Sequence, residues 1–221
     1  MSFQTTLKRS FILSGITLHS GEISTMTVHP APANTGILFK RIDLVAPNHQ
    51  RIIECSIDNI INSQLCTSLE NMYGHKVNMT EHLLSAFHGL NIDNALIDLN
   101  TSELPILDGS SKEIVEAIEC VGIKELNMPK KVIRILKPFI VGDENSFIKV
   151  QPSDKLSIDY TIVYNHSLIK RQNFRLDELN EYNYKEMISS SRTFGFEDEV
   201  EYLRNQGLIK GGSVDLSLIH I

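Results

Sequence analysis

Apolar and polar residues alternate over much of the first sixty positions, which is the pattern of strands with one face buried. A glycine-bounded turn at residues 15–21 and a proline-rich connector at 30–36 interrupt the alternation. The extended segments predicted on this basis are residues 5–13, 23–28, 37–42 and 51–61. The first part of the chain is therefore expected to form a β-sheet.

A helical period replaces the alternation at residues 80–90, and Thr80 is placed to cap the first turn. The apolar residues that recur at helical spacing are Leu83, Leu84, Phe87 and Leu90. The elements expected next are a strand at 94–99, a turn at 104–111 with Asp and Ser residues able to cap a helix, and a helix at 112–121. These helices would cover the sheet.

The pattern restarts near residues 127–131. The elements predicted beyond that point are strands at 132–141, 146–150 and 156–164 and helices at 181–190 and 197–205. Met26-Thr27-Val28-His29-Pro30 is echoed by Ile148-Lys149-Val150-Gln151-Pro152, which suggests a duplicated unit, although two unrelated β-meanders could also produce the similarity. The fold class predicted is α+β with two similar β-sheet-plus-helix domains, residues 1–127 and 128–221.

The second domain is expected to be incomplete. Residues 217–221 form an apolar run with no capping turn, and a sheet or helix that ends there would lack the layer that covers it. Either the chain is a fragment or a partner completes it.

Composition narrows the class of protein. The 221 residues are 42% hydrophobic and carry a formal net charge of −6, which is ordinary for a soluble globular protein and gives no reason to expect nucleic acid as a partner. The three cysteines are widely spaced, which predicts reduced, mostly buried thiols and a cytoplasmic location. No signal peptide and no membrane-spanning stretch is recognisable.

None of the eight histidines has His, Asp or Glu four residues later, so no complete zinc site of the helical type is visible. Glu81-His82 at the start of a predicted helix is the best partial signal, because zinc hydrolases place a general-base Glu beside a ligating His. The alternative is an exposed Glu in a first helical turn with a polar neighbour.

Three further candidates carry simpler alternatives. The Thr193 hydroxyl could stabilise an oxyanion or satisfy a turn. The Gly211-Gly212-Ser213 segment could bind phosphate through its amides or form a plain turn. Cys66 could be a nucleophile, but nothing near it in the sequence activates it, which favours a small buried apolar role.

A set of motifs occurs together and in order along the chain. They are Gly15-Ile16-Thr17-Leu18-His19-Ser20-Gly21, Pro30-Ala31-Pro32-Ala33-Asn34-Thr35-Gly36-Ile37, Leu65-Cys66-Thr67-Ser68, Glu81-His82-Leu83, Ile92-Asp93-Asn94, Glu103-Leu104-Pro105-Ile106-Leu107-Asp108-Gly109-Ser110, Ser191-Arg192-Thr193-Phe194-Gly195-Phe196 and Gly207-Leu208 to Gly211-Gly212-Ser213. From residue 5 to 219 the chain resembles the UDP-3-O-acyl-N-acetylglucosamine deacetylases, zinc amidases of lipid A synthesis, in a C-terminally truncated form.

The resemblance implies two α+β domains packed as a layered sandwich with helices between them, in a protein that is monomeric at full length. It implies Zn²⁺ as cofactor, His82 as one of three ligands, Glu81 as general base and Thr193 at the oxyanion. The substrate would be a small UDP-acyl-amino-sugar. The residues implied at its sugar are Leu65, Cys66 and Phe194, and those implied at its acyl chain, in an insert at about 197–219, are Val200, Ile209, Gly212, Ser213 and Ser217.

The family's other two ligands come from a His-Lys-x-x-Asp helix that has no counterpart here, so the zinc site is expected to be incomplete and the chain alone inactive. The family also usually has Thr where this chain has Met79. A decayed or non-catalytic homologue that keeps a sugar-nucleotide and acyl-binding scaffold is the alternative function. An unrelated two-domain adaptor would require the ordered motifs to be coincidence.

Overall fold

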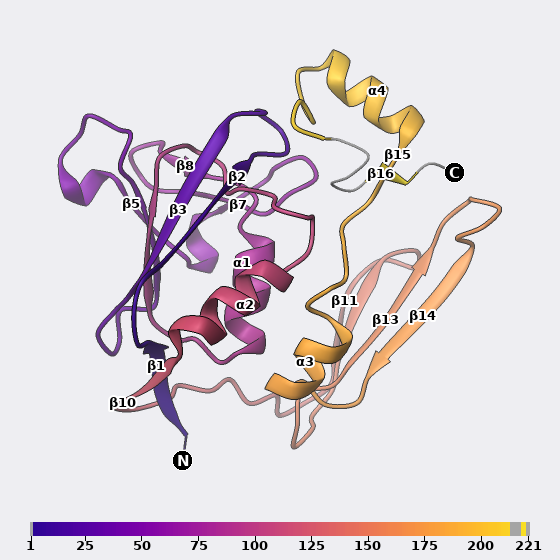
Figure 1. The fold of residues 1–221 in the computed structure, drawn as a ribbon. Coiled ribbons are helices and arrows are strands. Elements are labelled where there is room, and N and C mark those ends of the chain that lie inside the picture. The colour runs from indigo at the N-terminus through magenta and orange to yellow at the C-terminus, as the bar shows by residue number, and fades with distance from the viewer. Residues whose placement is uncertain (1, 213–217, 220–221) are drawn as a thin grey trace.

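The computed structural model describes residues 2–212 and 218–219, and over this part the chain is α+β, with several sheets and four α-helices (Figure 1). The helices are α1 (Glu81–Gly89), α2 (Lys112–Val121), α3 (Glu181–Met187) and α4 (Glu197–Asn205). The strands up to α2 are β1 (Phe3–Leu7), β2 (Phe11–Ile16), β3 (Ile23–Pro30), β4 (Ile37–Arg41), β5 (Ile52–Glu54), β6 (Ile60–Ile61), β7 (Ser68–Glu70), β8 (Lys76–Val77) and β9 (Ala95–Leu99), with short 3-10 helices at Asn48–Gln50 and Ile57–Asn59. The later strands are β10 (Ile123–Pro129), β11 (Phe139–Gly142), β12 (Phe147–Val150), β13 (Ile158–Val163), β14 (Arg171–Leu176), β15 (Gly195–Phe196) and β16 (Leu218–Ile219).

The main sheet has five strands in the order β2-β3-β9-β4-β5. Its pairings are antiparallel except for the central pair of β4 with β9, which is parallel. Alternate residues of β3 and β9 are buried, including Met26, Val28 and Ile97. The alternation seen in the sequence therefore marks one buried face of a real sheet.

Helices α1 and α2 belong to the same apolar core as the main sheet. Leu83, Ala86 and Phe87 of α1 are buried, as are Ile114 and Ile118 of α2. The predicted cap of α1 is wrong, because the Thr80 hydroxyl donates to the carbonyl oxygen of Thr67 at 3.1 Å instead of accepting from the helix. The hydroxyl thus ties the start of α1 to the loop before β7.

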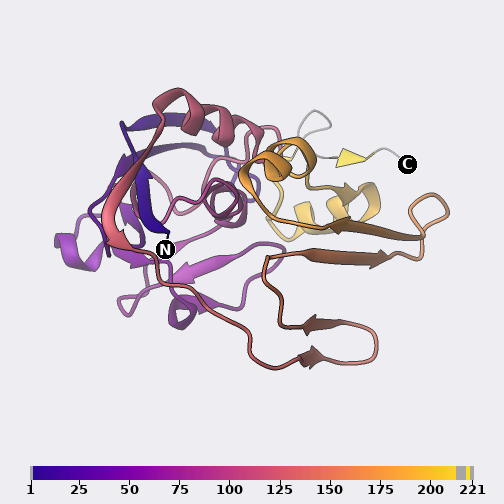
Figure 2. The same cartoon turned by 90° about the horizontal axis from the view of Figure 1, so that it is seen from below.

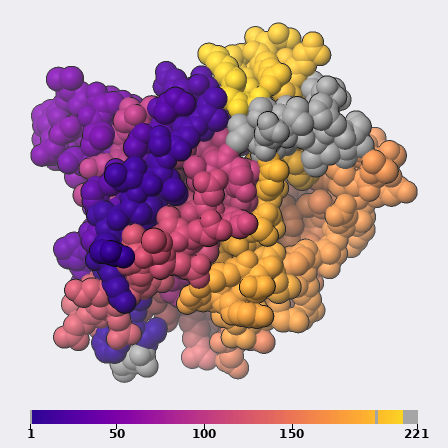
Figure 3. Space-filling view, in the orientation of Figure 1, coloured from indigo at the N-terminus to yellow at the C-terminus, as the bar shows by residue number. Residues whose placement is uncertain are grey.

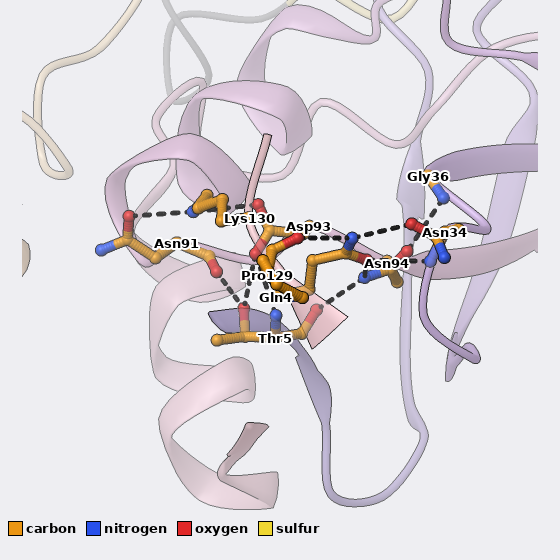
Figure 4. Close-up of polar contacts among 9 residues, drawn as sticks. All are labelled: Gln4, Thr5, Asn34, Gly36, Asn91, Asp93, Asn94, Pro129 and Lys130. Atoms are coloured by element: carbon orange, nitrogen blue, oxygen red, sulfur yellow. Dashed lines mark hydrogen bonds and ion pairs between the residues drawn. The ribbon is translucent and has the colours of Figure 1, made fainter. Parts of the chain in front are cut away.

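Strand β1 pairs with β10, which the sequence did not predict as a strand and which crosses the expected domain boundary at residue 127. Figure 4 shows the polar network beside this pair. Gln4 donates to Asn34 Oδ1 at 2.9 Å and accepts from Asn94 Nδ2 at 3.0 Å. The ammonium of Lys130 pairs with Asp93 at 2.9 Å. These contacts fasten both strands to the connector before β4 and to the start of β9.

The hairpins β11–β12 and β13–β14 each form a separate two-stranded sheet, and Figure 2 shows both extending away from the body of the first half. The strand predicted at 132–141 is wrong for residues 132–138, which have no strand partner, and the Ile133 side chain is 93% exposed. Strand β14 was not predicted. Most side chains of both hairpins are exposed, so their apolar residues contribute little to the core.

Helix α3 attaches the second half to the first. Its Tyr184 ring is buried against Gly89 of α1, and the Tyr184 hydroxyl lies 2.8 Å from Ser85 Oγ. A Cβ at Gly89 would lie 2.2 Å from Tyr184 Cγ, so only glycine allows this approach. Helices α1, α2 and α3 therefore lie between the main sheet and hairpin β13–β14, as Figure 1 shows.

The segment that contains α4 rests on the turn between β2 and β3. The amides of Lys210 and Gly211 donate to the carbonyl oxygens of His19 and Leu18 at 3.2 and 3.1 Å, respectively. Figure 3 shows this yellow segment meeting the indigo N-terminal part at the top of the molecule. A stretch more than 190 residues away in sequence thus borders the glycine-bounded turn.

Candidate active site

The start of α1 presents Glu81 and His82, both half-buried. The amide of Thr67 donates to Glu81 Oε2 at 2.9 Å, which fixes the carboxylate against the loop that carries Cys66. The Ser111 hydroxyl donates to the backbone oxygen of His82 at 3.0 Å and ties α1 to the start of α2. Both candidate residues are therefore positioned by elements from elsewhere in the first half.

Burial lowers the pKa of the His82 imidazole, and the nearby Glu81 and Asp108 carboxylates offset this only in part, so the pKa lies below its usual value. His82 is consequently neutral at pH 7, which is the form of imidazole that binds metal ions. Asp108 was not among the predicted site residues, and only folding brings it close to His82.

Left-handed backbone conformations recur at the loops around these side chains. Leu65, Met79 and Leu107 have φ values of 57°, 62° and 55°, and each lies one or two residues before Cys66, Glu81 or Asp108. Such conformations are costly for residues with side chains and persist where the surrounding structure requires them. Three separate loops therefore carry backbone strain immediately before a candidate site residue.

Thr193 reaches this region on the segment that follows α3. Its amide donates to the carbonyl oxygen of Gly109 at 2.8 Å, and Arg192 Nε donates to that of Asp108 at 2.6 Å. The next residue, Phe194, makes edge contacts with the rings of Tyr164 and Phe196, at centroid distances of 5.6 and 5.8 Å. The structure thus brings Thr193 to the loop that also approaches His82.

The residues implied at the acyl chain lie partly in a small apolar cluster. Val200 and Ile209 are buried in it with Leu203, and Leu18 packs against it. Gly212 accepts a hydrogen bond from Arg204 at 2.6 Å. Ser213 and Ser217 lie outside the described residues.

The phosphate interpretation of Gly211-Gly212 gains no support. The Gly211 amide donates to the carbonyl oxygen of Leu18 and the Gly212 amide to that of Ile209. Neither amide is therefore left to bind a phosphate.

The loop before β7 carries the two predicted sugar-site residues. Leu65 is exposed, whereas Cys66 is half-buried, with its sulfur 3.4 Å from Ser68 Oγ. His19 lies close enough to Cys66 and Glu81 for both to affect its pKa. Sequence reasoning did not place His19 in the site, because its partners are about fifty to sixty residues away along the chain.

The structure thus brings together a half-buried Glu-His pair at the start of α1, a nearby threonine and an aromatic cluster. A family model described as UDP-3-O-acyl N-acetylglycosamine deacetylase matches residues 4–220. The chain belongs to this family. The resemblance expected from the ordered motifs is therefore confirmed.

Curated relatives agree with this membership. UDP-3-O-acyl-N-acetylglucosamine deacetylases from Aliivibrio fischeri and Colwellia psychrerythraea are 37% and 39% identical to this chain, each over 98% of the chain and 70% of the relative. The relative from Pseudoalteromonas atlantica is 39% identical over 96% of the chain and 69% of the relative.

The donor set supplies only part of what a zinc ion needs. Catalytic zinc sites use three protein ligands, and a neutral His82 suits one of them. Among the side chains of residues 2–196 and 199–212, no group of three or more His, Cys, Asp or Glu is placed to hold a metal ion. The described residues therefore do not form a zinc site by themselves. Within the same residues no helix has the length and apolar character needed to cross a bilayer.

Proposed function

We propose that this chain carries one side of the active site of a zinc-dependent deacetylase that hydrolyses the N-acetyl group of UDP-3-O-acyl-N-acetylglucosamine in lipid A biosynthesis. The observation that carries the proposal is the pairing at the start of α1, where a neutral His82 imidazole lies beside the Glu81 carboxylate. The substrate is taken from the names of the relatives.

Each residue has a defined role in this proposal. His82 would be one zinc ligand, and a zinc ion held there would supply polarisation of a carbonyl group and a lower pKa for bound water. Glu81 accepts the proton of the attacking water as general base, and the Thr193 hydroxyl donates to the oxyanion that forms on the amide. The hydrogen bond from Thr67 to Glu81 supports this role, because it holds the carboxylate in one orientation.

The sugar and the acyl chain of the substrate are assigned to different parts of the chain. We assign the sugar to Leu65, Cys66 and Phe194, and the acyl chain to the insert at about 197–219. The residues proposed to line the acyl site are Val200, Ile209, Gly212, Ser213 and Ser217. The buried apolar cluster around Val200 and Ile209 supports an apolar ligand at this place.

We further propose that the 221-residue chain alone does not hydrolyse the substrate. One histidine cannot hold catalytic zinc against water, and the part of the chain that the structure describes groups fewer than three suitable side chains. The alternative function, a non-catalytic homologue that binds the sugar nucleotide or acyl chain, is favoured by the same observation. The deacetylase and the non-catalytic homologue differ in one respect: only in the deacetylase do Glu81 and His82 support hydrolysis when two further zinc ligands are supplied.

Zinc content and acetate release of the purified chain give the first test. After dialysis, elemental analysis is expected to find far less than one zinc per chain, and incubation with substrate and added zinc is expected to release no acetate. Tightly bound zinc near one per chain, or turnover by the chain alone, would show that this protein completes the site itself.

A chimera distinguishes the deacetylase from the non-catalytic homologue. Residues 4–220 of this chain would be joined to the part of the Colwellia psychrerythraea relative that the match leaves uncovered. We expect about one zinc per chimera and acetate release. Glu81→Gln should keep zinc and lower kcat by about 10²–10⁴-fold, since it removes a general base.

His82→Ala in the chimera should lose both zinc and activity. His88→Ala is the matched control, because His88 is exposed at the other end of α1. A folded chimera that binds zinc but releases no acetate would instead support the decayed or non-catalytic homologue.

The remaining expectations stay proposals of the same kind. We propose two similar domains, residues 1–127 and 128–221, packed as a layered sandwich. We also propose that the full-length form is a cytoplasmic monomer. The placement of three helices between the main sheet and hairpin β13–β14 supports the layered arrangement (Figure 1).

A further inference from the structure

The turn between β2 and β3 is held by a buried carboxylate. Glu103, 3% exposed, accepts hydrogen bonds from the amides of His19 and Ser20 at 2.7 and 3.0 Å, one on each carboxylate oxygen. Burying a carboxylate is costly unless hydrogen bonds compensate its charge, and the two amides supply them here. The turn is therefore fixed in a conformation that points both amides at Glu103.

Glu103 itself is anchored in the first half of the chain. It forms a parallel bridge with Asn78, and its backbone oxygen accepts from the Thr101 hydroxyl at 2.8 Å. The next residue, Leu104, is buried in the main core, and its amide donates to the carbonyl oxygen of Asn78 at 3.1 Å. The carboxylate is thus attached to the core and acts as a fixed point for the turn.

The same turn carries the segment that follows α4. The carbonyl oxygen of His19 accepts from the Lys210 amide at 3.2 Å, and that of Leu18 accepts from the Gly211 amide at 3.1 Å. His19 therefore joins Glu103 to Lys210 through its own backbone, because its amide bonds the carboxylate and its carbonyl oxygen bonds the segment. Displacing the turn would displace residues 207–212 with it.

Glycines allow the turn and the segment to approach closely. A Cβ at Gly211 would lie 2.0 Å from the carbonyl oxygen of Thr17, so a side chain there would push the segment away. On the other side of the contact, a Cβ at Gly21 would lie 3.0 Å from the Lys210 Cβ. The two backbones are in direct contact, so the position of one determines the position of the other.

The contact also places the apolar cluster assigned to the acyl chain. Val200, Leu203 and Ile209 are buried together, and the Leu18 side chain of the turn packs against them. Arg204 of α4 donates to the carbonyl oxygen of Gly212 at 2.6 Å, which ties the helix to the end of the segment. Helix α4 and the residues after it thus form one small unit that rests on the turn.

We propose that Glu103 is a positioning residue for the acyl site. Its carboxylate fixes the turn between β2 and β3, and the turn fixes the unit of α4 and residues 207–212 on the half of the chain that carries Glu81 and His82. An acyl chain would meet a displaced cluster at the wrong place, so Glu103 contributes to the selection of acyl-chain length. Only this link to acyl chains rests on the proposed function; the coupling of turn and segment is a property of the fold.

Hydrogen exchange followed by mass spectrometry on the intact 221-residue chain measures the coupling. Glu103→Gln keeps the shape of the side chain but removes its charge and one of its two acceptor oxygens. Peptides covering residues 17–21 and 207–212 should then exchange about tenfold or more faster, while peptides of α1 and α2 keep their parent rates. The matched control Glu125→Gln removes an exposed carboxylate on β10 and should change neither rate.

Gly211→Ala tests the direction of the coupling. Its Cβ would push the segment away from Thr17 while Glu103 still holds the turn, so residues 207–212 should exchange faster and residues 17–21 should keep the parent rate. This comparison decides the matter even if Glu103→Gln does not fold. The positioning role is refuted if a folded Glu103→Gln keeps the parent exchange at 207–212, or if Gly211→Ala speeds exchange at 17–21 as much as at 207–212.

Selectivity for the acyl chain is the functional measurement. In the chimera described above, kcat/KM would be compared for substrates with a long and a short 3-O-acyl chain. Glu103→Gln should lower the long-to-short ratio by about tenfold, mainly through a higher KM for the long chain, since losing the burial of about two methylene groups has an effect of that size. A purely structural loss would lower both values equally.

An unchanged ratio in an active Glu103→Gln chimera would overturn the role of Glu103 in acyl selection. A parent chimera that is inactive would count against the proposed function instead, and the exchange rates at residues 17–21 and 207–212 would still decide whether Glu103 positions the segment.

Discussion

The echoed motifs of the two halves have similar sequences and opposite surroundings. Met26 and Val28 on β3 are fully buried in the five-stranded sheet beneath α1 and α2, whereas Ile148 at the equivalent position on β12 is 69% exposed. Both segments form strands, so the local pattern is sufficient for the element. Burial requires a neighbouring layer, and within the described residues only the first half supplies one.

Deleting side chains at the equivalent positions should give the largest contrast. Met26→Ala should lower the free energy of unfolding by about 2–5 kcal/mol, because it leaves a cavity in a closed core. Ile148→Ala should change it by no more than about 0.5 kcal/mol. Chemical denaturation followed by circular dichroism measures both. Equal losses would mean that hairpin β11–β12 is packed in solution.

The contact between the halves offers a second test. Gly89→Ala should cost about 1–3 kcal/mol, because its Cβ would overlap Tyr184 and push α3 away from α1. Gly15→Ala is the control, since a Cβ there would be 3.4 Å from Pro105 Cβ, an ordinary contact. Thermal unfolding of both variants measures the difference. A Gly89→Ala protein as stable as its parent would show that α3 is not held against α1.

The smallest contrast is between two ion pairs of the same spacing. Arg41 and Asp43 pair through two contacts, at 2.8 and 2.5 Å, and the Arg41 guanidinium holds the pKa of the Asp43 carboxyl below its usual value. The pair of Arg175 with Asp177 in the second half is exposed and makes one contact at 2.8 Å. Asp43→Asn should cost up to about 1 kcal/mol at pH 7, and Asp177→Asn nothing measurable.

The pH dependence of the Asp43 contribution follows from the direction of its pKa shift. A carboxyl whose pKa is lower in the folded state stabilises the protein above the pKa of the unfolded chain, about 3.9, and loses that effect as the pH falls through the folded pKa. Asp43→Asn should therefore weaken the loss of stability below about pH 4. Urea denaturation at several pH values measures the free energy of unfolding. If that free energy falls below about pH 4 as steeply in Asp43→Asn as in the parent protein, the prediction is contradicted.

The sequence predicted the elements that depend on near neighbours. Helices α2 and α4 begin and end where expected, α1 is one residue shorter than expected at each end, and β9 is one residue shorter at its start. The strand prediction for residues 132–138 was wrong because a β-branched apolar run forms a strand only where a partner strand pairs with it. Strand β14 was not predicted because Arg171–Leu176 is largely polar. The Thr80 cap failed because the loop before β7 offered its hydroxyl another acceptor.

By itself the sequence determined the family, the α+β class and the Glu81-His82 pair at the start of α1, because ordered motifs and local periodicity are properties of the chain. Only the tertiary structure decided that Glu103 holds the amide of His19, that Thr193 reaches Gly109 and that Asp108 approaches His82. Each of these contacts joins residues more than twenty positions apart. Such neighbours are set by how sheets, helices and strained loops close on one core, which no local pattern records.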